Sequence, residues 1–199
     1  DAGVVAMLPG SRSGELRRHL PVLTAAYREL RRLRPRLRGI FGAADDAAAA
    51  TIARAIEGEA LQEVEVERGV SAAVARADVA WVASGTAVLE TALSGVAAIA
   101  IYVIPPILIR YGLRMIRHRF ITLPNLVLGR EVVPELLQEQ ATPERLAESA
   151  DALMKDPSAQ YAQFLELRRA LGPPDALARC ARFAVELARG NAANANVSL

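Results

Sequence analysis

Residues 79–93 constrain the fold more than any other stretch, because the apolar run VAWVA passes through Ser84-Gly85-Thr86 directly into the helical pattern TAVLETAL. A strand that turns at once into a helix leaves backbone N–H groups at the positive end of the helix dipole, which favours a phosphate. Glu90 follows Thr86 by four residues and therefore lies on the same helix face, one turn further in. A carboxylate there can accept hydrogen bonds from sugar hydroxyls, so the stretch predicts half of a nucleotide-sugar site.

A second turn of the same kind follows the first apolar run of the chain. Residues 3–8 predict a strand, which ends in Pro9-Gly10-Ser11-Arg12 before a helix predicted over residues 15–34. This loop can present N–H groups and an arginine side chain to an anion. Because the carboxyl ends of parallel strands meet at one edge of a sheet, we expect residues 9–12 and 84–86 to lie close together.

Apolar runs and helical patterns alternate through the first half of the chain. Further strands are predicted over residues 37–42, 61–67 and 96–103, and the alternation of apolar with polar residues in 61–67 is typical of a strand near a sheet edge. Helices are predicted over residues 45–57 and over 71–76 with a serine cap, and Pro21 is expected to kink or divide the first helix. This rhythm predicts an α/β fold, a Rossmann-like, doubly wound parallel sheet with helices on both faces.

The second half of the chain is predicted to be mainly helical. An amphipathic segment covers residues 106–117, and Pro134 suits the first turn of a helix that would carry Glu135 there and Gln138 one turn further on. C-terminal helices are predicted over residues 142–155, 158–171 and 174–189. We therefore expect a nucleotide-sugar-binding domain over residues 1–172, a C-terminal helix over 173–189 that packs on it or on a half absent from the chain, and a flexible tail over 190–199.

The composition excludes several classes of protein. At 199 residues the chain fits one domain, and although 52% of its residues are apolar, no uncharged run reaches the roughly 18 residues that a membrane-spanning helix needs. The single Cys180 excludes an intrachain disulfide framework and fits a reducing compartment. Two histidines, His19 and His118, and one cysteine do not make a metal-ligand set, so no metal is expected. Both histidines are expected to be structural or solvated, not catalytic.

Positive charge gathers in one short segment, although the net charge is only +2. The arginines are Arg28, Arg31, Arg32, Arg34, Arg36 and Arg38. Such a run is usually a solvated helix face, with contact to anionic lipid headgroups as the alternative. Nucleic acid is not expected as a partner, because no aromatic residues interleave with the arginines. The apolar and basic segment 106–119 fits either a membrane surface or packing against another helix.

Four blocks together resemble a known family. They are LPGSRSGEL at residues 8–16, SGTAVLETAL at 84–93, Tyr102, and LPNLVLGREVVPELLQ at 123–138. Their order and spacing are similar to those of the lipid A disaccharide synthases, glycosyltransferases of the two-domain GT-B class, and correspond to the C-terminal half of that family. The resemblance implies transfer of 2,3-diacylglucosamine from UDP-2,3-diacylglucosamine to 2,3-diacylglucosamine 1-phosphate, which forms a β-1,6-linked disaccharide and UDP without a metal or other cofactor.

The same resemblance assigns residues to a donor site. Ser11 and Arg12 would hold the diphosphate, while Ser84, Gly85 and Thr86 would cap it with hydroxyl and N–H groups. Glu90 would bind the ribose. The side chains that would line the cleft nearest the transferred sugar are Asn125, Glu135 and Gln138.

The resemblance also places part of the machinery outside the chain. The catalytic base and the acceptor domain would lie N-terminal to Asp1, so this chain is expected to bind donor without turnover. The implied location is the cytoplasm, peripheral at the inner face of the inner membrane, with a homodimer as a possible assembly. Two alternatives stay open: another UDP-sugar enzyme of the same architecture, such as an epimerase, or a non-catalytic module that binds a UDP-sugar or lipid.

Overall fold

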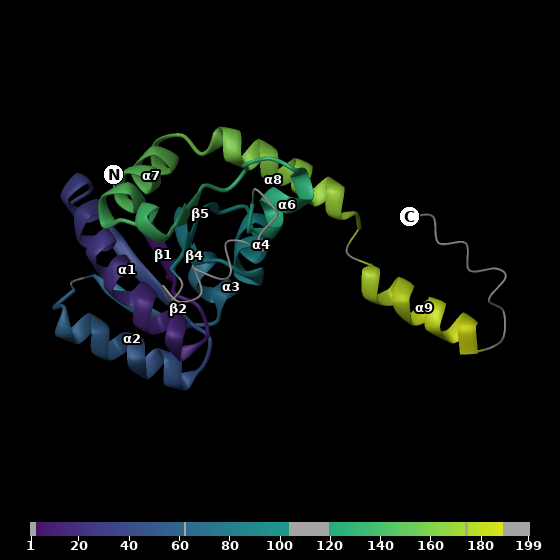
Figure 1. Cartoon of the computed structure of the whole chain (residues 1–199), viewed down its shortest axis with the longest axis horizontal. Helices are drawn as coiled ribbons and strands as arrows, with labels where there is room; N and C mark the ends of the chain where they lie inside the picture. Colours follow the sequence, from purple (N-terminus) through teal and green to yellow (C-terminus); the bar gives the residue numbers. More distant parts are fainter. Residues whose placement is uncertain (1–2, 62, 104–119, 174, 189–199) are drawn as a thin grey trace.

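The computed structural model describes residues 3–61, 63–103, 120–173 and 175–188, and its centre is a six-stranded sheet in the order β3-β2-β1-β4-β5-β6 (Figure 1). Every neighbouring pair of strands is parallel. The strands are β1 (Val4–Leu8), β2 (Arg38–Ala43), β3 (Val64–Arg68), β4 (Val79–Ala83), β5 (Ala97–Tyr102) and β6 (Glu135–Leu137). The predicted α/β, Rossmann-like fold is confirmed, including the edge position of β3.

Helices cover both faces of the sheet. They are α1 (Ser13–Leu33), α2 (Asp46–Gly58), α3 (Val70–Val74), α4 (Thr86–Leu93), α6 (Leu123–Leu128), α7 (Pro143–Lys155), α8 (Ser158–Leu171) and α9 (Ala176–Ala188), with a short 3-10 helix at Gln138–Gln140. Helices α1, α2 and α7 supply one buried cluster, whereas α3, α4 and α8 supply the other. The strand order reverses between β1 and β4, and ligands of open α/β sheets bind outside such a reversal.

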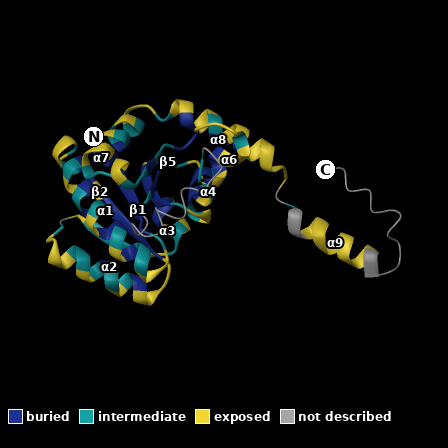
Figure 2. Cartoon of the chain, viewed as in Figure 1, coloured by how far each residue is buried: buried dark blue, intermediate teal, exposed yellow. Residues whose placement is uncertain are grey.

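Successive strand residues alternate between the two buried clusters, as the pleat of a strand requires. Along β4, Val79 and Trp81 belong to the cluster with α1 and α7, whereas Ala80 and Val82 belong to the opposite one. The indole Nε1 of Trp81 donates to the carbonyl of Leu146 on α7 at 3.1 Å, so this large ring is buried without an unpaired donor. Figure 2 shows the strands as the most buried layer, between the two layers of helices.

The prediction of a helix beginning at Pro134 is wrong. Residues Glu135–Leu137 form β6, which pairs with β5 through Ala100↔Glu135 and its two following partners. Three residues are too few to show a strand period, whereas a proline followed by an acidic residue is typical of a helix start. The strand ends at Leu137, and Gln138, whose φ is 50°, begins the short 3-10 helix that follows.

Two helix predictions also need correction. Pro21 lies inside α1, which continues through it as a single helix, so the predicted division is wrong, while the alternative of a kink stays a prediction. The apolar stripe that contains Leu20 and Leu23 is buried on the sheet, and that packing outweighs the backbone hydrogen bond that proline removes. Helix α3 begins one residue earlier than predicted, after Gly69, and no side chain caps it, so the expected serine cap is wrong.

The last described helix, α9, lies apart from the sheet, beyond the end of α8 (Figure 1). Its Phe183 and Val185 are exposed. The expected packing of this helix, on the domain or on a half absent from the chain, therefore stays a prediction. The predicted amphipathic segment 106–117 and the predicted tail 190–199 lie outside the described residues. None of the helices in the described ranges is long and apolar enough to cross a membrane.

Candidate functional site

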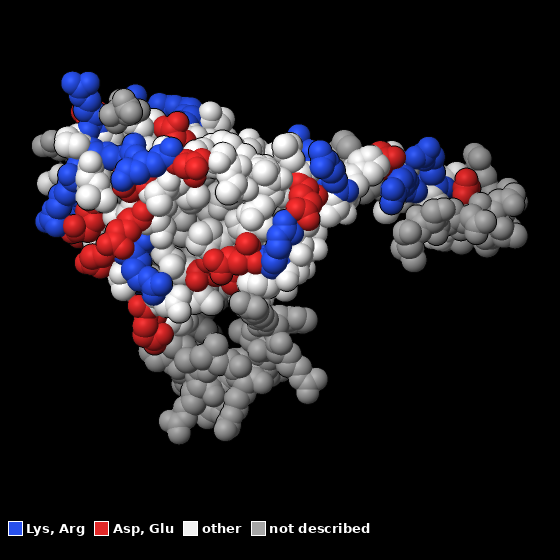
Figure 3. All heavy atoms as spheres, turned by 90° about the horizontal axis from the view of Figure 1, so that it is seen from above, with Lys and Arg blue, Asp and Glu red and all other residues white. Residues whose placement is uncertain are grey.

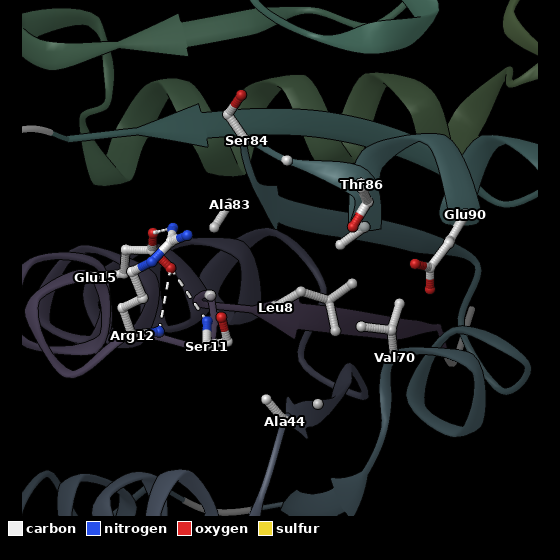
Figure 4. A pocket seen from close by; sticks show the side chains of 14 residues that line it. Leu8, Ser11, Arg12, Glu15, Ala44, Val70, Ala83, Ser84, Thr86 and Glu90 are labelled. Carbon is white, nitrogen blue, oxygen red and sulfur yellow. Dashed lines mark hydrogen bonds and ion pairs between the residues drawn. The ribbon is translucent and has the colours of Figure 1, made fainter.

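A cavity of about 410 Å³ opens at the carboxyl edge of the sheet, between the loops that follow β1 and β4 (Figure 4). Six of the predicted donor-binding residues line it: Ser11, Arg12, Ser84, Gly85, Thr86 and Glu90. The remaining lining includes Leu8 at the end of β1, Ala44 after β2 and Val70 at the start of α3. The expectation that the two turns meet at one edge is therefore confirmed.

The turn from β4 into α4 has an uncapped helix start. Gly85 is the N-cap residue, with a φ of 158° and a ψ of −161°, and no side chain accepts a hydrogen bond from the first turn. The Ser84 N–H donates to the carbonyl of Ile101 at 3.0 Å, which fixes the turn to β5. Because the first N–H groups of a helix have no partner within it, and no side chain of the described residues caps this one, the helix start offers donors to the cavity.

The side chains of this turn point in different directions in the close-up. Figure 4 shows the Thr86 hydroxyl and the Glu90 carboxylate directed into the cavity, whereas the Ser84 hydroxyl points away from Leu8 and Arg12. Thr86 and Glu90 are both exposed. The predicted spacing of one helical turn between Thr86 and Glu90 therefore places both groups on the cavity side of α4.

The β1–α1 loop differs, because its N–H groups already have an acceptor. The Glu15 carboxylate accepts hydrogen bonds from the backbone N–H groups of Ser11 at 3.1 Å and Arg12 at 3.3 Å. It also pairs with Arg12 Nη1 at 2.9 Å. Burial raises the pKa of the Glu15 carboxyl, but the hydrogen bonds from Arg12 outweigh burial, and the net pKa lies below its ordinary value.

Glu15 also lines the cavity, and sequence reasoning did not assign it. A signal was present, because an acidic residue three positions after a helix N-cap is the pattern of a capping box. Gly10 allows this contact. Its φ is 100°, and a Cβ at this position would overlap Glu15 Oε2 and lie 3.0 Å from the Glu15 Cβ.

His19 supports the same loop from beneath. Its side chain is fully buried, with Nδ1 2.8 Å from the Pro9 carbonyl and Nε2 accepting from the Val103 N–H at 3.1 Å. The acceptor role of Nε2 requires that Nδ1 carries the proton and donates to Pro9. Burial lowers the pKa of His19, which favours this neutral form. The expectation that His19 is structural is confirmed, whereas His118 lies outside the described residues.

Asn125 lies in a buried network, and it does not line the cavity. Its Oδ1 accepts from the N–H groups of Val132 at 2.8 Å and Val133 at 2.9 Å. Its Nδ2 donates to the Val133 carbonyl and to Glu135 Oε1, both at 2.8 Å. These four bonds use the hydrogen-bonding capacity of the amide, so in this structure Asn125 has a supporting position instead of the expected cleft-lining one.

Glu135 and Gln138 also lie outside the residues that line the cavity. The Glu135 carboxylate accepts from the Thr122 N–H at 3.0 Å, from the Thr122 hydroxyl at 2.8 Å and from the Ile121 N–H at 3.1 Å. It therefore ties β6 to the start of α6. Gln138 is half-buried and begins the 3-10 helix directly after β6. The structure does not bring these two residues to the cavity, and their expected contact with a sugar stays a prediction.

The arginine run is largely paired with carboxylates. Arg28 pairs with Glu59 at 2.5 Å, Arg32 with Glu29 at 2.5 Å, and Arg38 with Glu65. Arg34 is mostly buried and binds Asp151 on α7 at 2.7 Å. On the face shown in Figure 3, basic and acidic side chains are likewise intermixed. Arg28 and Arg32 on α1 agree with the predicted solvated helix face, whereas Arg34 follows the end of α1 and is mostly buried, and Arg38 lies on β2. The ion pairs reduce the positive charge available to an anionic partner.

Comparison with known proteins places the chain in a family. The model of the lipid-A-disaccharide synthetase family matches residues 1–171. The chain belongs to this family. It is 38% identical over 191 residues to a lipid-A-disaccharide synthase of Myxococcus xanthus, covering 94% of this chain and 50% of that protein. A lipid-A-disaccharide synthase of Pseudomonas putida is 34% identical over 168 residues, covering 84% and 45%. The chain thus spans about half the length of the curated synthases that it matches.

Solved structures of the same fold are more distant in sequence. A putative UDP-N-acetylglucosamine 2-epimerase from Listeria monocytogenes superposes with a TM-score of 0.64 at 12% identity, covering 96% of this chain and 46% of that one. The catalytic domain of a cholesterol-α-glucosyltransferase from Helicobacter pylori gives 0.52 at 12% identity, covering 86% and 99%. At such identities the likeness shows the fold alone, and it agrees with one half of a GT-B glycosyltransferase.

Proposed function

We propose that this chain is the donor-binding half of a lipid A disaccharide synthase. In this proposal it binds UDP-2,3-diacylglucosamine, from which the sugar passes to 2,3-diacylglucosamine 1-phosphate with release of UDP. The observation that supports it most directly is the cavity between the β1–α1 and β4–α4 loops, in a chain that belongs to the lipid-A-disaccharide synthetase family. The rest of the length of the relatives would supply the acceptor site and the catalytic base.

The proposed chemistry of this half is stabilisation of the departing diphosphate. The uncapped start of α4 directs N–H groups and the positive end of the helix dipole toward the cavity. The Thr86 hydroxyl adds a donor on the same side, and the Arg12 guanidinium, which is exposed and pairs with Glu15, would add a positive charge. These groups provide charge stabilisation without a metal, and the absence of a cofactor requirement is part of the proposal.

Glu90 has a different role in the proposal. It lies one helical turn beyond Thr86 on the cavity side of α4. A carboxylate at the helix start itself would repel a diphosphate bound there. Because Glu90 lies one turn further along the helix, its carboxylate can instead accept two hydrogen bonds from a ribose diol. We therefore place the phosphates at the helix start and the ribose beside Glu90.

The proposal is tested by isothermal titration of UDP against the wild-type chain, Arg12→Ala and Glu90→Ala. Loss of a charge-assisted hydrogen bond costs about 1.5–3 kcal/mol, so each variant should weaken UDP binding about tenfold or more. Arg17→Ala and Glu57→Ala are matched controls, because both residues are exposed and neither lines the cavity. Unchanged affinity in both site variants would refute the site assignment.

A second measurement separates the synthase from other UDP-sugar enzymes. Competition of UDP with UDP-2,3-diacylglucosamine and with UDP-N-acetylglucosamine should favour the acylated donor if the chain belongs to a lipid-handling enzyme. Equal competition would favour an epimerase or another glycosyltransferase of the same architecture. Because both proposed substrates carry acyl chains, we also propose peripheral action at the cytoplasmic face of the inner membrane, which flotation with anionic liposomes would test.

A further inference from the structure

The Glu15 carboxylate places a negative charge in the cavity where the proposed function would bind the negatively charged diphosphate of a UDP-sugar. Its side chain is only 14% exposed, whereas that of its partner Arg12 is 83% exposed. Figure 4 shows the carboxylate beside the backbone nitrogens of Ser11 and Arg12 with the guanidinium folded toward it. The carboxylate thus occupies the donors that this loop would offer to a phosphate.

A carboxylate and a phosphate compete for such donors because both are oxyanions that accept from backbone N–H and guanidinium groups. Glu15 is ionised at neutral pH, since its pKa lies below the ordinary value. The charged side chains among the cavity-lining residues are Arg12, Glu15 and Glu90, so the described lining carries more negative than positive charge. A diphosphate that enters this cavity meets a cation that is already neutralised.

The helix cap alone does not require this charge. In a capping box, the residue three positions after the N-cap needs only an oxygen that accepts from the N-cap N–H, and glutamine supplies one as well as glutamate does. In this structure, however, the Glu15 carboxylate accepts from the N–H groups of Ser11 and Arg12 and also forms an ion pair with the Arg12 guanidinium. The charge of Glu15 is therefore available for a role beyond that of a cap.

We propose that Glu15 is a resident counter-ion that sets the affinity of the site for diphosphates. Arg12 exchanges its partner, leaving the Glu15 carboxylate for the phosphate of the donor and returning to it when UDP departs. Glu15 acts as a positioning residue through Arg12 and weakens the hold on the charged product, which favours its release. The inference rests on the proposed binding of a UDP-sugar.

The test is Glu15→Gln, which keeps an acceptor for the helix cap and removes the charge. UDP should bind about fivefold more tightly to the variant than to the wild-type chain at low ionic strength, and the gain should shrink as salt screens the charges. Uridine, which carries no phosphate, should bind equally to both. Glu144→Gln is the matched control, because Glu144 lies in the first turn of α7 and does not line the cavity.

A second measurement on the wild-type chain does not depend on the variant. The Nε–H resonance of Arg12, assigned by its loss in Arg12→Lys, should shift on addition of UDP and stay in place on addition of uridine. An unshifted resonance in the presence of bound UDP would overturn the exchange of partners. Unchanged or weaker UDP binding to Glu15→Gln would overturn the counter-ion role, whereas failure of the wild-type chain to bind UDP at all would refute the proposed function itself.

Discussion

The two loops that frame the cavity occupy equivalent places in the sheet but are built in opposite ways. The β1–α1 loop is held by internal contacts, from His19 to Pro9 and from Glu15 to Ser11 and Arg12. The β4–α4 turn begins at a glycine N-cap that no side chain caps. The N–H groups of Ser11 and Arg12 therefore already have an acceptor within the protein, whereas the start of α4 leaves its N–H groups open to a ligand. Substitution of His19 or Gly10, which hold the first loop in place, should mainly affect stability, whereas substitution of Thr86 in the second should mainly affect binding.

His19→Ala should give the largest effect and would show most clearly that the first loop is structural. Loss of the ring leaves the Pro9 carbonyl and the Val103 N–H without their buried partner and opens a cavity, so the free energy of unfolding should fall by about 3 kcal/mol. Urea denaturation at pH 7.5 measures it. His19→Gln, which can restore one of the two bonds, is the control and should recover part of the loss. A loss below about 1 kcal/mol in His19→Ala would contradict the comparison.

Gly10→Ala should rank second. The added methyl group would overlap Glu15 Oε2 at a backbone φ of 100°, and the combined crowding and strain should cost about 2–3 kcal/mol of the free energy of unfolding. Gly14→Ala is the matched control, because a Cβ there meets only the flexible Arg18 side chain inside a helix, where alanine is favoured. Equal effects of the two substitutions in urea denaturation would show that the Glu15 contact does not constrain the loop.

Thr86→Ala tests the β4–α4 turn, which we expect to contribute to binding more than to stability. Thr86 is exposed, so its loss should change the free energy of unfolding by less than about 0.5 kcal/mol. UDP binding, measured by titration calorimetry, should weaken about tenfold, which corresponds to about 1.4 kcal/mol for a lost hydrogen bond to a charged oxygen. Thr51→Ala on α2 is the control. A destabilised variant with unchanged UDP affinity would reverse the assignment of roles.

The smallest expected effect is a pH dependence at Glu15. Its pKa is lowered in the folded chain, so the unfolded chain binds more protons and the free energy of unfolding rises with pH. The contribution is complete above the unfolded pKa of about 4.3 and is lost as the pH falls through the folded value. The stability difference between the wild-type chain and Glu15→Gln should therefore shrink measurably, by up to about 1 kcal/mol, between pH 5 and pH 3. A difference that is constant across urea titrations in this range would contradict the ion pair.

Much of the fold was predictable from the sequence because its signals are local. Apolar runs followed by turn residues identify β1, β2, β4 and β5, and the alternation of apolar and polar residues in β3 predicts its edge position. The meeting of the two turns followed from the geometry of a parallel sheet. Strand β6 was missed because its three residues are fixed by pairing with β5, which no local pattern reveals.

The site was predictable only in part, because local patterns place some of its residues and contacts between distant residues place the others. Arg12, Thr86 and Glu90 follow strands or lie one helical turn apart, so local rules place them at the cavity. Asn125 and Glu135 lie in residues 123–138, where no local pattern predicts the direction of a side chain. Contacts such as those of Asn125 with Glu135 and Val132 decide whether these residues face a ligand or the interior. Glu15 was visible as a capping residue, but its contact with both N–H groups of the loop depends on the conformation of Gly10.

The side chain of Gln160 on α8 accepts from the Ala98 N–H at 2.8 Å and donates to the Ala98 carbonyl at 3.0 Å, where β6 is too short to pair with β5. An amide side chain thus takes the place of a strand residue. Without this amide, the Ala98 N–H and carbonyl would form an unpaired strand edge, to which a strand of another chain could add. Substitution of Gln160 should therefore increase aggregation during refolding at high protein concentration.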